Sequence, residues 1–329
     1  MRIILAPMEG VVDCGIRDVL TRIGGYDRCV TEFVRVVNEQ RIPEKVFLRF
    51  SPELTQGGTT PSGVPVYLQL LGGNRQSMAI NAGLAQALEP PRIDLNFGCP
   101  SKTVNKSDGG SVLLKEPQRV GDIVAAVRDA VDPKIPVTAK IRLGFSNHDF
   151  LDEIATRIEN AGASELCIHA RTREDRYKPP AYWSVVKQIA EERSMPVIIN
   201  GEIWTVTDSE KARQESACDD IMLGRGALSC PDLALAIKAK RQGIDYHAMS
   251  WSEILGILLS YLIQSESKHD LFVSNRCKQW LAFLQRQYSG AGDLFQQIKR
   301  LKDANDVFDA IDVYQNKSIR LEKQYANAY

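Results

Sequence analysis

A cysteine at the end of a predicted strand, Cys99, is the residue of this sequence best placed to do chemistry. The stretch Ile93–Gly110 begins with a run, IDLNF, that predicts a buried strand of a parallel sheet. The run stops at Pro100, which has no backbone N–H for a strand ladder, so Cys99 is expected at the strand's carboxyl end. α/β barrels place their reactive groups at that end. A small apolar cysteine before an ordinary glycine loop is the alternative interpretation.

Charged side chains share one face of a second predicted strand. Alternation along Val137–Arg142 puts Lys140 and Arg142 on the same side, opposite an apolar face. The predicted strand Glu165–Ala170 repeats this arrangement, with Glu165, Cys167, His169 and Arg171 on one side. Two cations pointing into a barrel are costly unless an anion or polar ligand meets them, so we expect a ligand there. A structural Lys140–Asp94 ion pair inside the barrel is the alternative.

The last two predicted strands end in glycine-containing turns, Asn200-Gly201-Glu202 and Gly224-Arg225-Gly226. In barrels the loops at this position often bind phosphate through backbone N–H groups, and glycine permits close approach. Arg225 adds a fixed fork of donors. With Lys140 and the amide of Gln69, these turns predict a phosphorylated cofactor lying across the barrel mouth. Harmless glycine turns at strand ends are the alternative.

The composition is that of an ordinary globular protein, with 44% hydrophobic and 25% charged residues among 329. Its formal net charge of zero means that a polyanionic partner must be bound by a local patch of cations. The seven cysteines are scattered without metal-ligand spacing, so we expect reduced thiols, a cytoplasmic location and no metal site. No apolar run approaches the length of a membrane span, and we expect no membrane association.

Short apolar runs alternate with helix-length amphipathic stretches over roughly the first 240 residues. This alternation predicts an α/β fold, a (β/α)8 TIM barrel. A doubly wound sheet is the alternative, but Met8-Glu9-Gly10 lacks the glycine fingerprint expected after its first strand. The eight predicted strands are Arg2–Pro7, Cys29–Val34, Val64–Leu71, Arg92–Phe97, Pro136–Leu143, Glu165–Ala170, Pro196–Asn200 and Asp219–Leu223.

The pattern changes to helix alone after Gln242. Four amphipathic segments follow without an intervening strand, which predicts an all-α helical bundle. We therefore expect two domains, a TIM barrel over residues 1–242 and a helical domain over residues 243–329. The predicted helices of the second domain are Ser252–Gln264, Arg276–Tyr288, Asp293–Lys302 and Val307–Gln324.

Seven short motifs in this chain resemble those of the tRNA-dihydrouridine synthases, and they occur in the same order. They are APMEG at 6–10, QLLG at 69–72, NFGCP at 96–100, KIRLG at 140–144, HART at 169–172, NGEI at 200–203 and GRGA at 224–227. The resemblance covers essentially the whole chain. Details in Ile199–Trp204 and Arg276–Leu284 look most like the bacterial C subfamily. Ala170 and Ser111 depart from the family pattern, which usually has Gly and Ala there.

The resemblance implies an NAD(P)H-dependent flavin oxidoreductase that reduces a uridine of the tRNA D-loop to 5,6-dihydrouridine, with FMN bound and NADPH as electron donor. The C subfamily implies tRNA position 16. The implied catalytic residue is Cys99. The implied cofactor-binding residues are Pro7, Met8, Glu9, Gln69, Lys140, His169, Asn200, Gly201, Glu202, Gly224 and Arg225. The implied tRNA-binding residues are Arg35, Asn96, Arg142, Tyr177, Arg276, Lys278, Phe283 and Lys299.

The chemistry of uracil is consistent with a thiol at this site. Its carbon–carbon double bond accepts a hydride from reduced flavin at C6 and then needs a proton at C5. A thiol with a pKa of about 8.5 is mostly protonated at neutral pH yet acidic enough to donate, so Cys99 suits the second step. A stacked base cannot reach a barrel interior, so the target must be unpaired or extruded.

Two other functions fit parts of the pattern. A flavoprotein resembling dihydroorotate dehydrogenase would act on a free pyrimidine, but it would not need a basic helical domain. A tRNA-binding protein with a degenerate flavin site would not need Cys99, Lys140 and Arg225 together. We expect tRNA as the partner of a monomer, with no protein partner.

Overall fold

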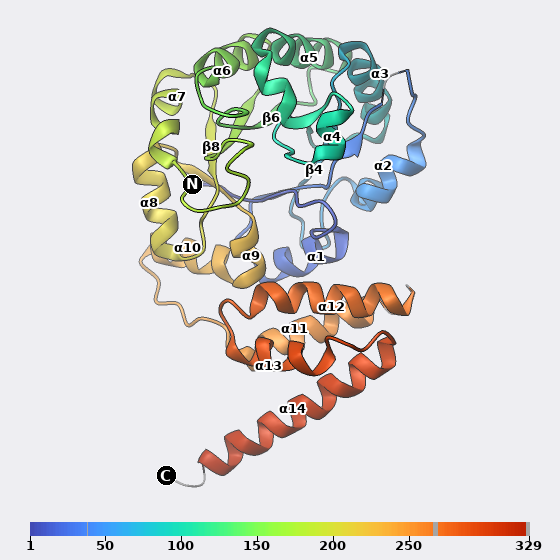
Figure 1. Cartoon of the computed structure of the whole chain (residues 1–329), viewed down its shortest axis with the longest axis vertical. Helices are drawn as coiled ribbons and strands as arrows, with labels where there is room; N and C mark the ends of the chain where they lie inside the picture. The colour runs from blue at the N-terminus through green and yellow to red at the C-terminus, as the bar shows by residue number, and fades with distance from the viewer. Residues whose placement is uncertain (38, 266–268, 327–329) are drawn as a thin grey trace.

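Eight parallel strands close into a barrel in the computed structural model, which describes residues 1–37, 39–265 and 269–326 (Figure 1). The circle closes because β2 pairs with β1 on one side and with β4 on the other, while β1 also pairs with β9. The predicted TIM barrel is thus confirmed, and the doubly wound alternative, an open sheet, is excluded. The strands are β1 (Ile3–Leu5), β2 (Arg28–Val30), β4 (Val66–Leu71), β5 (Ile93–Asn96), β6 (Val137–Arg142), β7 (Glu165–His169), β8 (Val197–Asn200) and β9 (Asp220–Leu223).

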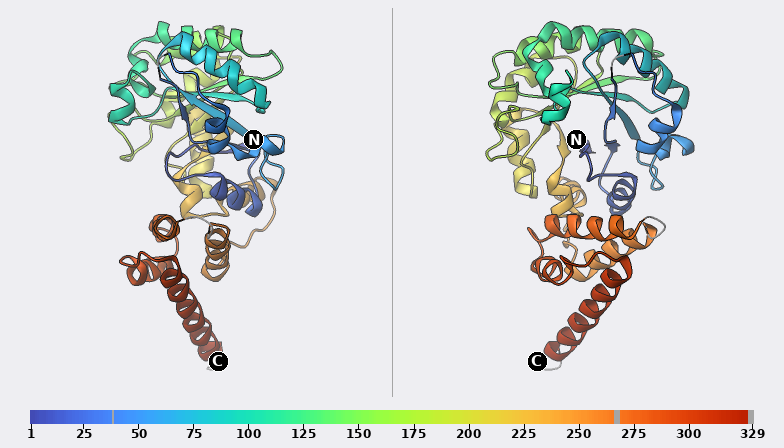
Figure 2. Two further views of the ribbon diagram at one scale, coloured as in Figure 1. Left: turned by 90° about the vertical axis from the view of Figure 1, so that its right-hand side faces the viewer. Right: turned by 45° about the vertical axis from the view of Figure 1, so that its right-hand side comes forward.

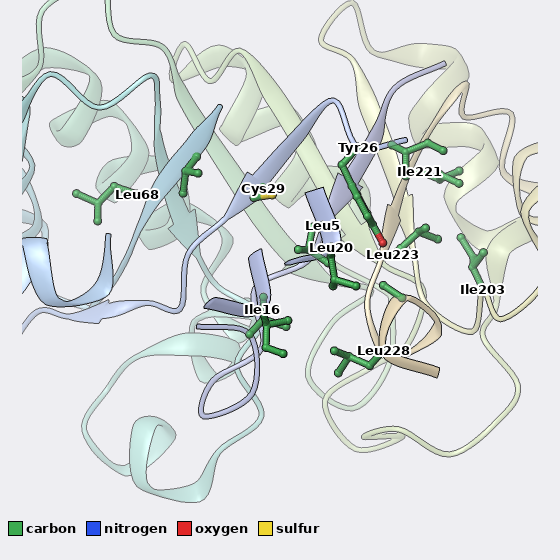
Figure 3. Packing of buried hydrophobic residues seen from close by; sticks show 14 of the residues in the cluster. Leu5, Ile16, Leu20, Tyr26, Cys29, Leu68, Ile203, Ile221, Leu223 and Leu228 are labelled. Atoms are coloured by element: carbon green, nitrogen blue, oxygen red, sulfur yellow. The ribbon is translucent and has the colours of Figure 1, made fainter. Parts of the chain in front are cut away.

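Helices cover the outside of the barrel and bury the outward face of each strand. Leu5 of β1 and Leu223 of β9 pack here against Ile16 and Leu20 of α1 and Leu228 of α9 (Figure 3). Period-2 alternation in the strands and apolar stripes on the helices account for this layer. The helices are α1 (Cys14–Ile23), α3 (Arg75–Ala85), α5 (Pro117–Ala130), α6 (Leu151–Asn160), α7 (Lys187–Glu192), α8 (Val206–Ser216), α9 (Arg225–Ser229) and α10 (Leu233–Gln242).

The barrel interior is layered, as the inward residues of β7 illustrate. Glu165 at the amino end lies among arginines, and Cys167 belongs to an apolar cluster with Tyr67 and Met222. His169 at the carboxyl end faces the mouth of the barrel. The apolar middle layer therefore separates a charged base from a polar mouth, and the mouth is where barrels carry function.

Two connections contain more structure than the sequence predicts. Residues 39–63, an excursion between the second and third predicted strands for which no helix was predicted, contain α2 (Glu44–Phe50) and the 3-10 helix η1 (Pro52–Gln56). Phe47 of α2 is buried, and the buried guanidinium of Arg17 pairs with Glu53 of η1 at 2.8 Å. The excursion therefore packs against the barrel. The two-residue strand β3 (Val34–Arg35), α4 (Lys102–Lys106) and the 3-10 helix η3 (Gly110–Lys115) also occupy loops beside the mouth.

The C-terminal helical region contains α11 (Trp251–Gln264), α12 (Asp270–Leu284), α13 (Ser289–Ile298) and α14 (Ala304–Ala326). It lies below the barrel, with α12 next to α1 and α9, and α14 projects away from both (Figures 1 and 2). Both boundaries of the two middle helices are wrong, since α12 runs from Asp270 to Leu284 where Arg276–Tyr288 was predicted, and α13 from Ser289 to Ile298 where Asp293–Lys302 was predicted. The unusual N-cap His269 accepts from the Leu271 N–H and permits the earlier start of α12.

The chain between α10 and α11 has no regular secondary structure from residue 243 to residue 250. Gly243, in a left-handed conformation with φ 69°, ends α10. We propose that the domain boundary lies here, at Gln242–Gly243. Within the described residues, no helix is both long and apolar enough to cross a membrane.

Candidate active site

A cavity of about 410 Å³ opens at the carboxyl ends of the barrel strands. Its volume lies within the range typical of ligand sites, roughly 300–1,000 Å³. The cavity brings together every residue that the sequence assigned to a cofactor, together with Cys99 and four of the eight residues assigned to tRNA. These lining residues are Pro7, Met8, Glu9, Gln69, Asn96, Cys99, Lys140, Arg142, His169, Tyr177, Asn200, Gly201, Glu202, Gly224, Arg225 and Phe283.

A buried hydrogen-bond network fixes the amide of Gln69 on the cavity wall. Gln69 Nε2 donates to Asp94 Oδ2 at 2.7 Å, and its Oε1 accepts from Asn96 Nδ2 at 2.8 Å. Thr138 Oγ1 donates to the other oxygen of Asp94 at 2.6 Å. Burial raises the pKa of Asp94, although these hydrogen bonds oppose the rise. The carboxylate therefore sets which way the amide of Gln69 points.

Lys140 extends from β6 into the same space. Its Nζ donates to Asn200 Oδ1 at 3.0 Å, and Asn200 Nδ2 in turn donates to the Met222 carbonyl oxygen at 2.8 Å. Both carboxylate oxygens of Asp94 accept from Gln69 and Thr138, so the Lys140–Asp94 pair of the structural alternative does not form. Burial lowers the pKa of Lys140, which makes an anionic ligand at this ammonium favourable.

Two arginines and one carboxylate lie at the other end of the cavity. Glu202 forms an ion pair with Arg171 and lies 3.7 Å from Arg225. Desolvation, and then the charges of Arg225 and Arg142, lower the pKa of Arg171 to about 10. One carboxylate cannot neutralise two guanidinium groups, so this end favours a phosphate. Sequence analysis noted Arg171 but did not assign it to the site.

His169 and Gly201 form the wall between these two ends. Burial, and then Arg142 and Lys140, hold the pKa of His169 well below its ordinary value, so the imidazole is neutral at physiological pH. Gly201 has φ 115°, and a Cβ at this position would lie 2.8 Å from His169 Cδ2. Only glycine therefore leaves the space beside the imidazole open.

Cys99 lies in a loop whose backbone is held by hydrogen bonds from both sides. Asn96 Oδ1 accepts from the backbone N–H of Gly98 at 2.9 Å and of Cys99 at 3.0 Å. The carbonyl oxygen of Cys99 accepts from Ser111 Oγ at 2.8 Å and Asn105 Nδ2 at 3.1 Å. Ser111, a departure from the family pattern, thus contributes a bond that alanine could not. Burial raises the pKa of the Cys99 thiol above its ordinary value, and the nearby Glu9 adds to the rise.

Arg142 connects the Cys99 loop to the loop that follows β7. Its Nε donates to the Gly98 carbonyl oxygen at 2.8 Å, and its Nη1 donates to the carbonyl oxygens of Thr172 at 3.0 Å and Arg176 at 2.9 Å. The guanidinium also lies 5.2 Å from the ring centroid of Tyr177, which is half exposed at the cavity edge. Arg142 therefore organises the entrance as well as facing it.

A second hollow of about 730 Å³ continues from the first, past Cys99 and Tyr177. Arg35, Lys102 and Arg176 line it, and Phe33 and Phe50 provide apolar surface. This places Arg35, which the sequence assigned to tRNA, outside the first cavity but beside the Cys99 loop. Cations and aromatic rings next to one another are typical of surfaces that bind single-stranded nucleic acid.

The helical domain contributes to the site through α12. Phe283 lines the cavity, whereas Arg276 and Lys278, also assigned to tRNA, make contacts within the chain. The ammonium of Lys278 donates to the Leu301 carbonyl oxygen, and that of Lys299 to Gln296 Oε1 at 2.5 Å. The tRNA roles of Arg276, Lys278 and Lys299 stay predictions.

Several lining residues were missed by the sequence analysis. The indole of Trp204 lies between two guanidinium groups, with Arg225 5.0 Å and Arg286 3.9 Å from the ring centroid. Trp204 belonged to a recognised motif, so that motif could have identified it, but no local signal connects it to Arg286. The other missed residues are Ala6, Val11, Phe33, Gly98, Pro100, Arg171, Ile203, Met222 and Gly226.

Comparison with known proteins agrees with this geometry. Residues 4–319 match the model of a family described as Dihydrouridine synthase. The chain is 50% identical over 304 residues to the tRNA-dihydrouridine(16) synthase of Pseudomonas putida, covering 92% of this chain and 94% of the relative. It is 48% identical over 318 residues to the enzyme of that name from Shewanella oneidensis, covering 96% and 99%.

The chain belongs to the dihydrouridine synthase family. Among solved structures it resembles histamine dehydrogenase from Rhizobium sp. 4-9, with a TM-score of 0.55 at 17% identity over 74% of this chain and 46% of the other. At that identity the likeness supports the barrel fold alone.

The site of this family member fits a flavin mononucleotide. Arg171 and Arg225 at one end suit a phosphate, and the amide of Gln69 and the ammonium of Lys140 at the other suit a polar ring edge. The space kept open by Gly201 lies between them. None of the seven cysteines, all within the described residues, forms a disulfide.

Proposed function

We propose that this chain reduces a uridine in the D-loop of tRNA to 5,6-dihydrouridine, with FMN as bound cofactor and NADPH as electron donor. The carrying observation is that one cavity unites Cys99, Lys140 and Arg225 at the mouth of the barrel. The family match and the names of two relatives support the reaction and its tRNA substrate. Because both names specify position 16, we propose the same target here.

In this proposal, different residues bind the two ends of the cofactor. Arg225, Arg171 and the turn at Gly201 bind the phosphate, and Lys140 and Gln69 bind the polar edge of the ring. When bound and reduced, FMN supplies the hydride that the uracil C6 accepts. The Lys140 ammonium stabilises negative charge on its side of the site, and its burial among fixed hydrogen bonds means that little reorganisation is needed.

The proton for uracil C5 comes from Cys99 in this proposal. Because burial raises the thiol pKa, Cys99 remains protonated at neutral pH and is available as a general acid. Arg142 and Tyr177 contact the substrate nucleotide at the entrance. Asn96 helps to position Cys99, because its side-chain oxygen accepts from backbone N–H groups of the Cys99 loop.

The tRNA approaches over the hollow beside the Cys99 loop. Its cations Arg35, Lys102 and Arg176 bind phosphates next to the extruded uridine, and Phe33 and Phe50 contact unstacked bases. We also propose that the enzyme acts as a monomer in the cytoplasm. Seven cysteines without a disulfide support a reducing compartment.

The decisive experiment is a reaction of the purified FMN-loaded protein with NADPH and unmodified tRNA. We expect dihydrouridine at position 16, mapped by primer extension after alkaline cleavage, and none in free uridine or orotate. Cells that lack the gene should lose the modification at that position alone. Reduction of the free pyrimidine would favour the dihydroorotate-dehydrogenase-like alternative, and loss at a different D-loop position would refute the assignment to position 16.

The pH dependence of tRNA reduction should reflect the raised pKa of Cys99. A general acid works while it is protonated, so the rate should hold at neutral pH and fall as pH rises through the thiol pKa. Because burial raises that pKa, the fall should come at a higher pH than the value of about 8.5 typical of a free thiol. Single-turnover reduction of tRNA by pre-reduced enzyme, measured from pH 6 to 10, tests this. A rate that increases through this range would contradict the assignment.

A further inference from the structure

We propose that Arg276 and Gln279, in the helical domain, are positioning residues of the cofactor site in the barrel. They hold the loop between β1 and α1, whose residues Met8 and Glu9 line the cavity. This inference rests on the proposed FMN site. It gives the helical domain a part in cofactor binding in addition to its predicted part in tRNA binding.

The guanidinium of Arg276 is occupied by the β1–α1 loop and by its own helix. Its Nη1 donates to the carbonyl oxygen of Gly10 at 2.7 Å and of Val11 at 3.2 Å, and its Nη2 donates to Asp13 Oδ2 at 3.0 Å. Gln279 Oε1 accepts a further bond at 2.8 Å. The Arg276 side chain is only 13% exposed. To contact a phosphate, Arg276 would have to release several of these acceptors, so cofactor-site support is the role that the contacts favour.

Gly10 is held on both of its faces. Gln279 Nε2 donates a second hydrogen bond to the Gly10 carbonyl oxygen at 3.0 Å. The Gly10 N–H donates to Glu32 Oε1 at 2.5 Å. The residue has φ 68°, a conformation that glycine adopts without strain. A glycine of this kind is free to change conformation, so the bonds from α12 and Glu32 are what fix the direction of the chain just after Met8 and Glu9.

The same face of α12 also touches the phosphate end of the site. Trp280 Nε1 donates to the carbonyl oxygen of Leu228, in the short helix α9 that begins at Arg225, at 3.2 Å. Phe283, seven residues after Arg276 and so on the same face, lines the cavity directly. One helix face thus contacts both loops that flank the proposed FMN, and Figure 1 shows α12 lying beside α1 and α9.

The test measures FMN affinity on apo-protein of the full chain by fluorescence titration. Arg276→Ala removes charge-assisted hydrogen bonds, so we expect its FMN dissociation constant to rise about tenfold or more. Arg276→Lys keeps one cationic donor, so its FMN dissociation constant should lie between those of the wild type and Arg276→Ala. Arg300→Ala, which removes an exposed arginine of the same domain, should match the wild type. The visible absorption bands of bound FMN should shift in Arg276→Ala, because the loop that carries Met8 and Glu9 is no longer fixed.

A tRNA-binding assay at saturating FMN separates this role from a phosphate contact. We expect weaker FMN binding by Arg276→Ala whether or not its tRNA dissociation constant also rises, because the predicted tRNA contact of Arg276 is measured separately. Unchanged FMN affinity with weakened tRNA binding would overturn the inference and assign Arg276 to RNA. If circular dichroism shows that Arg276→Ala does not fold, the test uses Gln279→Ala instead. We expect weaker FMN binding by Gln279→Ala than by its control, Gln285→Ala. If the wild type binds no FMN, the proposed function itself fails, which is a separate result.

Discussion

Replacing Cys99 with alanine is expected to abolish most tRNA reduction while leaving the flavin half-reaction intact. Loss of a general acid costs roughly 10²–10⁴-fold in rate. The thiol lies on the Cys99 loop, whereas the proposed phosphate contacts Arg171 and Arg225 lie at the other end of the cavity. FMN retention and NADPH oxidation by Cys99→Ala should therefore equal those of the wild type.

The measurement is single-turnover formation of dihydrouridine, set beside NADPH oxidation without tRNA. Cys218→Ala is the matched control, because this buried cysteine packs in the outer core away from the cavity. It should reduce tRNA at the wild-type rate per folded molecule. A Cys99→Ala protein that purified without FMN, or reduced tRNA normally, would show that Cys99 is not the proton donor.

The barrel and the inward faces of its strands were predictable because they follow from local periodicity. Parallel strands buried on both faces appear as continuous apolar runs between glycine and proline, and alternation alone placed Lys140 and Arg142 toward the mouth. His169 was placed by the same rule. These residues lie on strands, where sequence spacing fixes the direction of a side chain.

The contacts of the helical domain were not predictable in this way. The resemblance assigned Arg276 to tRNA, a role that stays a prediction, but no sequence pattern indicated its contact with the carbonyl oxygen of Gly10, 266 residues away. The stacking of Arg286 on Trp204 also joins residues that are far apart in the sequence, so no local pattern predicts it. Helix periodicity indicates which residues share a face, but it does not indicate what that face packs against.

A second large effect is expected at the base of the barrel, where a single carboxylate serves three arginines. Glu165 accepts from Arg28 Nη1 at 2.8 Å and lies 3.1 Å from Arg92 Nη1 and 3.4 Å from Arg2 Nη2. Its side chain is 4% exposed. Desolvation would lower the pKa of Arg28, but hydrogen bonds and charge from Glu165 outweigh it and raise that pKa. Glu165 therefore offsets the desolvation free energy of the buried, charged Arg28.

Glu165→Ala should lower the free energy of unfolding by about 3–5 kcal/mol, because it leaves a buried guanidinium without its counter-charge. Urea unfolding followed by circular dichroism measures this loss. Glu165→Gln, which keeps an acceptor oxygen, should lose less, and Glu153→Ala, which breaks an exposed pair with Arg157, should lose less than about 1 kcal/mol. The apolar layer of Cys167, Tyr67 and Met222 separates this base from the mouth, so tRNA reduction per folded molecule should be unchanged. A Glu165→Ala protein as stable as the wild type would mean that water or backbone rearrangement satisfies Arg28.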